Sequence, residues 1–424
     1  MLIALLIFIL LLLLKVPIAF VLGITSIIYI VFFGNIGLLA TAPQRLYSGI
    51  ESYGLLAIPL FMLAGELMNS GGITRRLITF SKAVIGHYRG GLAYVNVVAN
   101  MFLASIIGSA TAQIAMMSRV MVPSMEKEGY DRAFSASTTA SAALLGPIIP
   151  PSMLFIIYSV TASQSIGTMF LAGIIPGVLL MLGFVGLIAF IGYKQNLPVS
   201  KKESFKNVMI SFFQVLPALL VPAIIIIGIL GGIFTPTESA AIACFIALVV
   251  GAIYRELKFK DIPNILVNTT LSTATVTLLI AMANLFGWVL TFEQIPQALA
   301  QWMTSLTESP IIFLLLITIF LLIVGTVMDG IAALIILVPI FMPLLPLYGI
   351  DPIHFGVIIC INLTIGLLTP PVGAGLFIAS SIGDVKFEKL SKAILPFLVV
   401  SIIVLLLLTF IPDLVLWIPS LVNG

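Results

Sequence analysis

Two stretches of the chain, residues 108–176 and 325–396, carry the same irregular series of helix breakers inside otherwise apolar sequence. The series is a Gly-x-Asp triplet, a glycine, a Pro-Pro pair and a lone proline, and each member recurs 220 residues later. The members are Gly129, Asp131, Gly146, Pro150, Pro151 and Pro176, then Gly349, Asp351, Gly366, Pro370, Pro371 and Pro396. Because Gly and Pro interrupt helices for different physical reasons, their kept order predicts a fold built from two similar halves.

The composition identifies the class of protein. At 61% hydrophobic and 8% charged residues, with a mean hydropathy of +1.26, the chain is a polytopic membrane protein rather than a soluble domain. Its 19 basic and 16 acidic residues are scattered at helix ends, so no nucleic-acid partner is expected. Cys244 and Cys360 lie in apolar segments and are interpreted as small buried hydrophobes. The first residues lack a signal-peptide pattern and are interpreted as a retained span.

The lengths of the apolar segments indicate which parts of the remaining sequence can span a membrane. A helix needs roughly 20 apolar residues to cross a bilayer core. The candidates, two of them broken, are residues 2–14, 17–33, 54–70, 131–160, 169–193, 211–230, 236–254, 265–291, 352–382 and 396–418. We therefore predict an all-α polytopic membrane protein with about 11 transmembrane segments.

Two further segments, residues 92–125 and 310–345, are each too long for one span. Small and polar residues interrupt them at 108–112 and 325–330, which leaves halves of about 20 Å that are too short to cross. We predict two re-entrant helical hairpins. Non-helical tips at mid-depth are tolerated only where they are buried in protein or line a wet cavity.

The distribution of Lys and Arg sets the orientation, since these residues favour the cytoplasmic side. Arg89 and Lys127 flank the first hairpin, whereas no basic residue lies between Lys260 and Lys386, the range that holds the second hairpin. The first hairpin should then open inward and the second outward, which makes the repeats inverted. Both termini are expected outside, and Arg45 is the one exception to the assignment.

These patterns predict a division into two repeats. Residues 1–195 form the first, with scaffold helices in 1–70, and residues 208–424 form the second, with scaffold helices in 211–291. A basic cytoplasmic linker, 196–207, joins them. Residues 73–88 and 294–306 are expected to be in-plane amphipathic helices.

The broken spans are the places where chemistry is expected. Consecutive prolines open a helix and free carbonyls, and the C-terminal end of a half-helix carries a partial negative charge. Carbonyls and hydroxyls with little fixed charge suit Na⁺ better than a divalent ion. A simple kink would explain one break, but two breaks, each paired with a hairpin, favour two cation sites. The first would join Ser105, Gly108 and Ser109 to Gly146, Ile149 and Pro151, and the second would join Gly325 and Thr326 to Gly366, Thr369 and Val372.

Asp329 is the most informative single residue, because a carboxylate near mid-depth usually faces a functional cavity. It can also cap the helix that follows it, and the two roles are compatible. Arg119 can neutralise an anionic solute or can snorkel to the cytoplasmic mouth. The residues proposed to bind a polar solute are Asp329, Ser109, Thr111, Gln113, Asn362 and Arg119.

Other polar residues suggest no enzyme. Glu238 completes a capping box with Thr235, and Glu66 is expected only to reach the cytoplasmic interface. His87 and His354 lie too far apart for a catalytic triad or a zinc site, and no phosphate-binding loop is present, so ATP hydrolysis is not expected.

Gly-Pro-Ile-Ile-Pro-Pro-Ser at 146–152 and Gly-Leu-Leu-Thr-Pro-Pro-Val-Gly at 366–373, each after a hairpin, resemble one family. They are similar to the large membrane subunit (M subunit, DctM-like) of tripartite ATP-independent periplasmic (TRAP) transporters, within the ion-transporter superfamily. The resemblance covers essentially the whole chain. It favours the sialic-acid branch, and dicarboxylate relatives remain open.

The resemblance implies a Na⁺-coupled elevator transporter in the bacterial inner membrane, with two or more Na⁺ ions at the tips and breaks. It also implies a small four-helix membrane subunit (Q subunit) and a periplasmic substrate-binding protein (P subunit) that delivers an acidic solute. Ile149 and Thr369 occupy related positions but differ, so the two cation sites cannot use identical side-chain ligands. A channel-like or scaffold subunit without coupled transport is the competing class, and an intramembrane hydrolase is a third.

Overall fold

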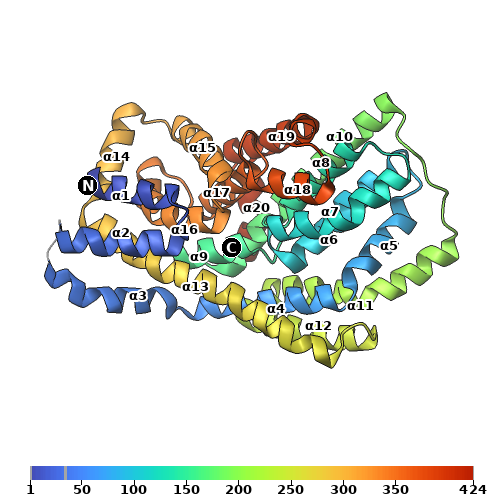
Figure 1. Ribbon diagram of the computed structural model, residues 1–424, viewed down its shortest axis with the longest axis horizontal. Coiled ribbons are helices and arrows are strands. Elements are labelled where there is room, and N and C mark those ends of the chain that lie inside the picture. Colours follow the sequence, from blue (N-terminus) through green and yellow to red (C-terminus); the bar gives the residue numbers. More distant parts are fainter. Residues whose placement is uncertain (1, 33–35, 424) are drawn as a thin grey trace.

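The computed structural model describes residues 2–32 and 36–423, and within these ranges it contains helices and no strand (Figure 1). The first half contains α1 (Leu2–Leu13), α2 (Ile18–Phe32), α3 (Ala42–Ile50), α4 (Ala57–Ser70), α5 (Ile73–Ile85), α6 (Gly91–Ile107), α7 (Ala110–Lys127), α8 (Arg132–Ala142), α9 (Met153–Thr161) and α10 (Ile166–Gln195). The second half contains α11 (Phe205–Leu230), α12 (Pro236–Ile253), α13 (Ile262–Phe292), α14 (Ile295–Leu306), α15 (Pro310–Val327), α16 (Gly330–Phe341), α17 (Pro352–Gly366), α18 (Ala374–Gly383), α19 (Phe387–Phe410) and α20 (Asp413–Asn423). Short 3₁₀ turns are η1 (Ile36–Thr41), η2 (Tyr53–Leu56), η3 (Ala143–Leu145), η4 (Phe259–Asp261) and η5 (Met342–Tyr348).

Each half contains the predicted pair of a helical hairpin and a broken helix. The hairpins are α6–α7 and α15–α16, and the broken helices are α8–α9 and α17–α18. The first tip depends on Gly108, whose φ of +61° lies in the left-handed region that glycine tolerates. Both breaks contain a cis Pro-Pro bond, at Pro150-Pro151 and Pro370-Pro371. The helical architecture is therefore confirmed.

Eight helical segments in the described ranges are long and apolar enough to cross a membrane. They include Pro310–Val327 and Gly330–Tyr348, so the prediction that the arms of the second hairpin are too short to cross is wrong. Helix α15 continues to Val327, through Gly325 and Thr326, because neither residue obliges a helix to end. Arm length therefore does not establish that this hairpin is re-entrant.

The predicted last span, 396–418, is also wrong in its bounds. Helix α19 begins at Phe387 and ends at Phe410, and α20 begins again at Asp413. Pro412 lacks a backbone N–H and disfavours helical conformation in the residue before it, so the chain leaves the helix at this point. Pro396 lies inside α19 and does not mark its start.

The helices form two packed groups that contact each other. In the first group, α4 packs against α12, and α13 packs along α2, α3 and α4. In the second group the halves interlock, because α7 of the first hairpin packs on α18, while α16 of the second hairpin packs on α9. Helix α13 also contacts α16, and α4 contacts α6, so the groups meet at the hairpins.

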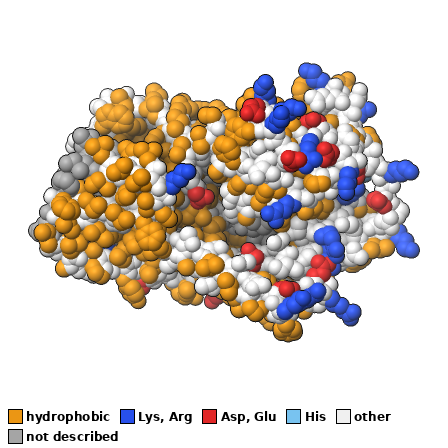
Figure 2. Space-filling model, in the orientation of Figure 1, with side chains coloured by type: hydrophobic (Ala, Val, Ile, Leu, Met, Phe, Trp, Pro, Cys, Tyr) orange, Lys and Arg blue, Asp and Glu red, His pale blue; other side chains and the backbone are white. Residues whose placement is uncertain are grey.

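Helix α5 links the two groups near a charged end of the molecule. It packs on α6 and α11, and its Arg75 and Arg76 both pair with Glu256 beyond the end of α12, at 2.6 and 2.9 Å. Lys and Arg side chains gather toward one end of the face shown in Figure 2, and hydrophobic side chains cover the other. This asymmetry fits a cytoplasmic position for the basic end.

Two glycines bring the second hairpin and the second broken helix close together. A Cβ added to Gly366 of α17 would lie 2.6 Å from the Cα of Gly325 in α15 and 2.8 Å from the carbonyl oxygen of Leu322. Both neighbours are backbone atoms that cannot rotate away. The contact between the second hairpin and the second broken helix therefore requires that Gly366 carry no side chain.

We expect Gly366→Ala to lower the free energy of unfolding by about 1–3 kcal/mol, the usual range for overpacking. Thermal unfolding of the purified protein in lipid nanodiscs measures the change. Gly186→Ala is the matched control, since Gly186 lies inside α10 and alanine favours a helix. Apart from the adjacent backbone of α10, no atom of the described residues lies within 4 Å of a Cβ added there. Equal midpoints for both variants would contradict the glycine contact.

Candidate functional site

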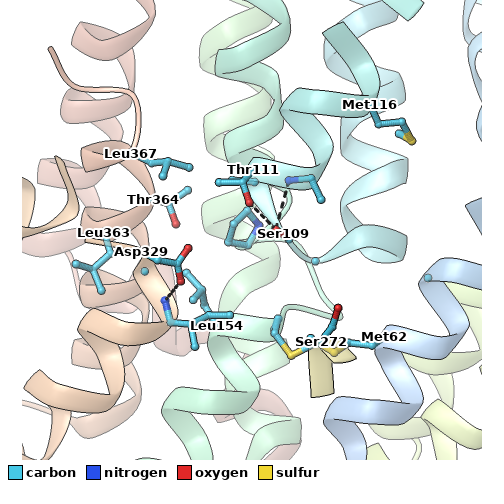
Figure 3. A pocket seen from close by; sticks show the side chains of 18 of the residues that line it. Met62, Ser109, Thr111, Met116, Leu154, Ser272, Asp329, Leu363, Thr364 and Leu367 are labelled. Atoms are coloured by element: carbon cyan, nitrogen blue, oxygen red, sulfur yellow. Dashed lines mark hydrogen bonds between the residues drawn. The ribbon is translucent and has the colours of Figure 1, made fainter. Parts of the chain in front are cut away.

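A cavity of about 300 Å³ lies where the two hairpin tips face each other. Its walls come from α4, the first tip, the first break, α13, the second tip and α17. In Figure 3, Ser109 and Thr111 of the first tip face Asp329 of the second. Thr364 of α17 and Leu367, which follows that helix, lie nearby. The structure thus brings together three of the residues predicted to bind solute.

Ser109 organises the first tip. It is the N-cap of α7, its hydroxyl contacts that of Thr111 at 3.1 Å, and it accepts a long hydrogen bond of 3.5 Å from the amide of Ala112. Gly108 lies against the first break, since a Cβ added there would be 3.4 Å from the nitrogen of Met153 and 3.7 Å from the carbonyl oxygen of Pro151. The tip and the break therefore form one surface.

Asp329 organises the second tip. Its carboxylate accepts a hydrogen bond of 2.9 Å from the amide of Ile331 and caps α16. The residue is exposed to the cavity, so the second carboxylate oxygen remains available. The capping role that the sequence predicts is confirmed, and it leaves Asp329 free to contact a solute.

Three helices begin at the cavity. Ala110, Met153 and Gly330, the first residues of α7, α9 and α16, all line it. A helix N-terminus carries roughly half an elementary positive charge together with unpaired amide groups. Asp329 offsets the charge of α16. The termini of α7 and α9 are capped only by the neutral side chains of Ser109 and Ser152, so this part of the cavity favours an anion.

The charged side chains that line the cavity are acidic, opposite in sign to the positive helix N-termini. Among the described residues that line it are two carboxylates, Asp329 and Glu66, and no Lys or Arg. Any attraction for an acidic solute must come from backbone amides, helix termini or bound cations.

Three predicted solute contacts do not line the cavity. Gln113 is fully buried, and its amide nitrogen donates to the backbone and side-chain oxygens of Asn100 at 2.7 and 2.8 Å. Asn362 is fully buried and donates to the carbonyl of Ile358. Arg119 is exposed and outside the cavity. Each lies on a helix whose cavity face is formed by other residues.

The predicted first cation site has suitable ligands in the break. The Ser152 hydroxyl donates to the carbonyl of Pro147. No hydrogen bond within the described chain reaches the carbonyls of Gly146, Ile149 or Pro151. Buried carbonyls without donors are what a small cation can satisfy. The side chain of Ser105 lies outside the described residues.

The second predicted site is more open. Gly325 and Gly366 are in contact, the carbonyl of Gly366 accepts a bond from the Thr369 amide at 2.9 Å, and Val372 is 44% exposed. The hydroxyls of Thr326 and Thr369 donate to the carbonyls of Ile323 and Ile365 and keep lone pairs for another ligand. The residues fit a cation with less preorganisation than those of the first site.

Sequence reasoning missed one wall of the cavity. Glu66 and Asn69 of α4, with Thr269 and Ser272 of α13, line it together with Met62. The expectation that Glu66 only reaches the cytoplasmic interface is wrong. Positions 62, 66 and 69 share one helix face, as do 269 and 272, so polar residues at helical spacing inside apolar spans were the available signal.

Comparison with known proteins places the chain in a family. The model of the "Tripartite ATP-independent periplasmic transporter, DctM component" matches residues 5–414. The sialic acid TRAP transporter large permease SiaM of Vibrio cholerae is 38% identical over 413 residues, 96% of each chain. The C4-dicarboxylate TRAP transporter large permease DctM of Pseudomonas aeruginosa is 40% identical over 377 residues, 89% of this chain and 88% of that protein.

Among solved structures, the YdaH transporter of Alcanivorax borkumensis is 17% identical, with a TM-score of 0.62 over 91% of this chain and 89% of that chain. This likeness supports the fold alone. The relatives at about 40% identity are permeases for different solutes, so the comparison leaves the solute open. The chain belongs to the DctM family, the large permeases of TRAP transporters, and is a multi-pass protein of the bacterial inner membrane.

Proposed function

We propose that this permease imports an acidic solute by secondary active transport coupled to Na⁺. The observation that carries the proposal is the cavity between the hairpin tips, where the N-termini of α7, α9 and α16 converge. Broken helices that direct their N-termini at a shared cavity are the usual arrangement for binding an anionic group in secondary transporters.

Na⁺ would supply the positive charge that the lining side chains lack. The first ion would be held by the tip residues Ser105, Gly108 and Ser109 with the carbonyls of Gly146, Ile149 and Pro151. The second would be held by Gly325, Thr326, Gly366, Thr369 and Val372. Ser109 and Thr111 would bind the solute from the first tip and Asp329 from the second, while Met153 and Leu154 shield it from water.

The movement proposed is that of an elevator. Two observations support it: the interlocking of each hairpin with the broken helix of the other half, and the separate packing of α4, α12 and α13. The interlocked group would move as one body against the other helices, with the hairpins re-entrant from opposite sides. A channel-like or scaffold subunit without coupled transport is the alternative.

The partners proposed are a small four-helix membrane subunit and a periplasmic binding protein, within a lipid bilayer. The solute favoured is a sialic acid, N-acetylneuraminate, and a C4-dicarboxylate or another organic acid is the alternative. The two relatives named above differ in this respect, since one is named for sialic acid and the other for C4-dicarboxylates.

Uptake into proteoliposomes tests the proposal. The permease, reconstituted with its small subunit and candidate binding proteins, should accumulate labelled acid against its gradient when Na⁺ is outside. K⁺ in place of Na⁺ should abolish accumulation. Na⁺ currents that do not depend on solute, without accumulation, would instead support the channel-like alternative.

Asp329→Asn separates the charge of this residue from its capping role. Asparagine caps helices about as well as aspartate, so the thermal midpoint should stay close to that of the wild type. Na⁺-driven uptake should fall at least tenfold, because the free carboxylate oxygen at the cavity is lost. Uptake at the wild-type rate would remove Asp329 from the proposed site.

A thiol at the first tip tests alternating access. In a background of Cys244→Ala and Cys360→Ala, Thr111→Cys should react with an impermeant reagent from either side, and the preferred side should change with Na⁺ and solute. Tyr193→Cys is the control, since Tyr193 is 85% exposed near the basic end of α10. Its variant should react from one side only. Labelling of the Thr111 variant from one side under all conditions would contradict the elevator.

A further inference from the structure

The cavity has a polar wall opposite α17 that the proposed function does not use. Glu66 and Asn69 of α4, with Thr269 and Ser272 of α13, form this wall, which we call the scaffold wall. Figure 3 shows Ser272 and Met62 across the cavity from Thr364 and Leu367. The scaffold wall comes from the helices that pack together outside the interlocked hairpins.

The scaffold wall includes a polar group without a hydrogen-bond partner, the hydroxyl of Thr269. It is only 7% exposed, and its buried hydroxyl has no hydrogen-bond partner among the described residues. A threonine within a helix usually bonds back to a preceding carbonyl, and a buried hydroxyl without a partner is unfavourable. Thr269 lines the cavity, so a rotation of its side chain would turn the buried hydroxyl toward a ligand group placed there.

The acidic side chains of the cavity favour a solute with one carboxylate over a solute with two. Glu66 on the scaffold wall and Asp329 at the second tip are acidic, and no described lining side chain is basic. One carboxylate of a solute can sit at the N-termini of α7 and α9. A second carboxylate would meet Glu66 across the cavity and be repelled. A hydroxyl or amide N–H in the same place would instead donate to Glu66.

The volume of the cavity also favours a hydroxylated monocarboxylate over a small dicarboxylate. About 300 Å³ is at the lower end of the volumes of small-molecule sites, and a four-carbon diacid would leave much of it empty. A larger acid with several hydroxyl groups would fill the cavity and reach both walls.

We propose that the scaffold wall selects a monocarboxylate rich in hydroxyl or amide groups, of the sugar-acid class, and excludes dicarboxylates. Glu66 is the specificity-determining residue, and Asn69, Thr269 and Ser272 complete the hydrogen-bonding surface. This inference rests on the proposed function, since it concerns the same cavity. It assigns the discrimination to the permease itself, in addition to any selection by a binding protein.

Direct binding to the purified permease with its small subunit, without a binding protein, tests the inference. Thermal shift or calorimetry in Na⁺ would compare N-acetylneuraminate, as the hydroxylated monocarboxylate, with succinate. We expect the wild type to bind N-acetylneuraminate at least tenfold more tightly. Glu66→Gln should reduce this ratio about tenfold, mainly by improving succinate binding, and Thr269→Val should weaken only N-acetylneuraminate.

Glu308→Gln is the matched control, because Glu308 is exposed and lies outside the cavity; its ratio should equal that of the wild type. Equal wild-type affinities for both acids, or an unchanged ratio in Glu66→Gln, would overturn the inference. Na⁺-dependent succinate binding with that result would leave the proposed function intact. Failure of both acids and of wider acid panels to bind in Na⁺ would instead count against the proposed function and the inference together.

Discussion

Backbone groups without hydrogen-bond partners are the constraint on which this structure depends. In hydrocarbon such groups cost several kcal/mol each, yet the chain interrupts its helices at Gly108, at 146–152, at 328–329 and at 367–373. The fold places these helix interruptions next to one another instead of distributing them through the molecule. The tip at Gly108 lies on the first break, and Gly325, near the second tip, packs on Gly366 at the second break. Their polar atoms can thus be satisfied by one another, by water in a shared cavity, or by ions.

Because the two halves interlock, the repeat produces one shared cavity instead of two separate ones. A hairpin packed only on the broken helix of its own half would give two separate sites. Because α7 packs on α18 and α16 on α9, both tips reach the same cavity. Ser109 and Asp329 lie 220 residues apart in sequence and still face each other (Figure 3). The repeat thus builds one shared cavity, the proposed solute site, with a cation position proposed on either side.

The sequence predicted elements whose signals are local. Hairpins, breaks and caps follow from Gly, Pro, Ser and Asp at defined places, and the capping box of Thr235 and Glu238 is present as predicted. The lining of the cavity was harder to predict, because composition says which residues are polar but not which way a helix is rotated. Gln113 and Asn362 turn into protein, whereas Glu66 turns into the cavity. That rotation is fixed by packing between helices that are distant in sequence, of α7 on α18, α4 on α13 and α17 on α10.

The electrostatics of the cavity also could not be read from side chains. Arg119 is the cation that the sequence offers for an acidic solute, and it is exposed elsewhere. The positive end of the cavity is built from backbone, at the starts of α7 and α9, where it needs no long side chain and no reorganisation. A fixed Arg would hold a carboxylate whether or not Na⁺ were bound. Partial charges at helix termini are weaker, so an anion facing Asp329 and Glu66 would need bound cations as well. This requirement is a physical argument for the Na⁺ coupling that we propose.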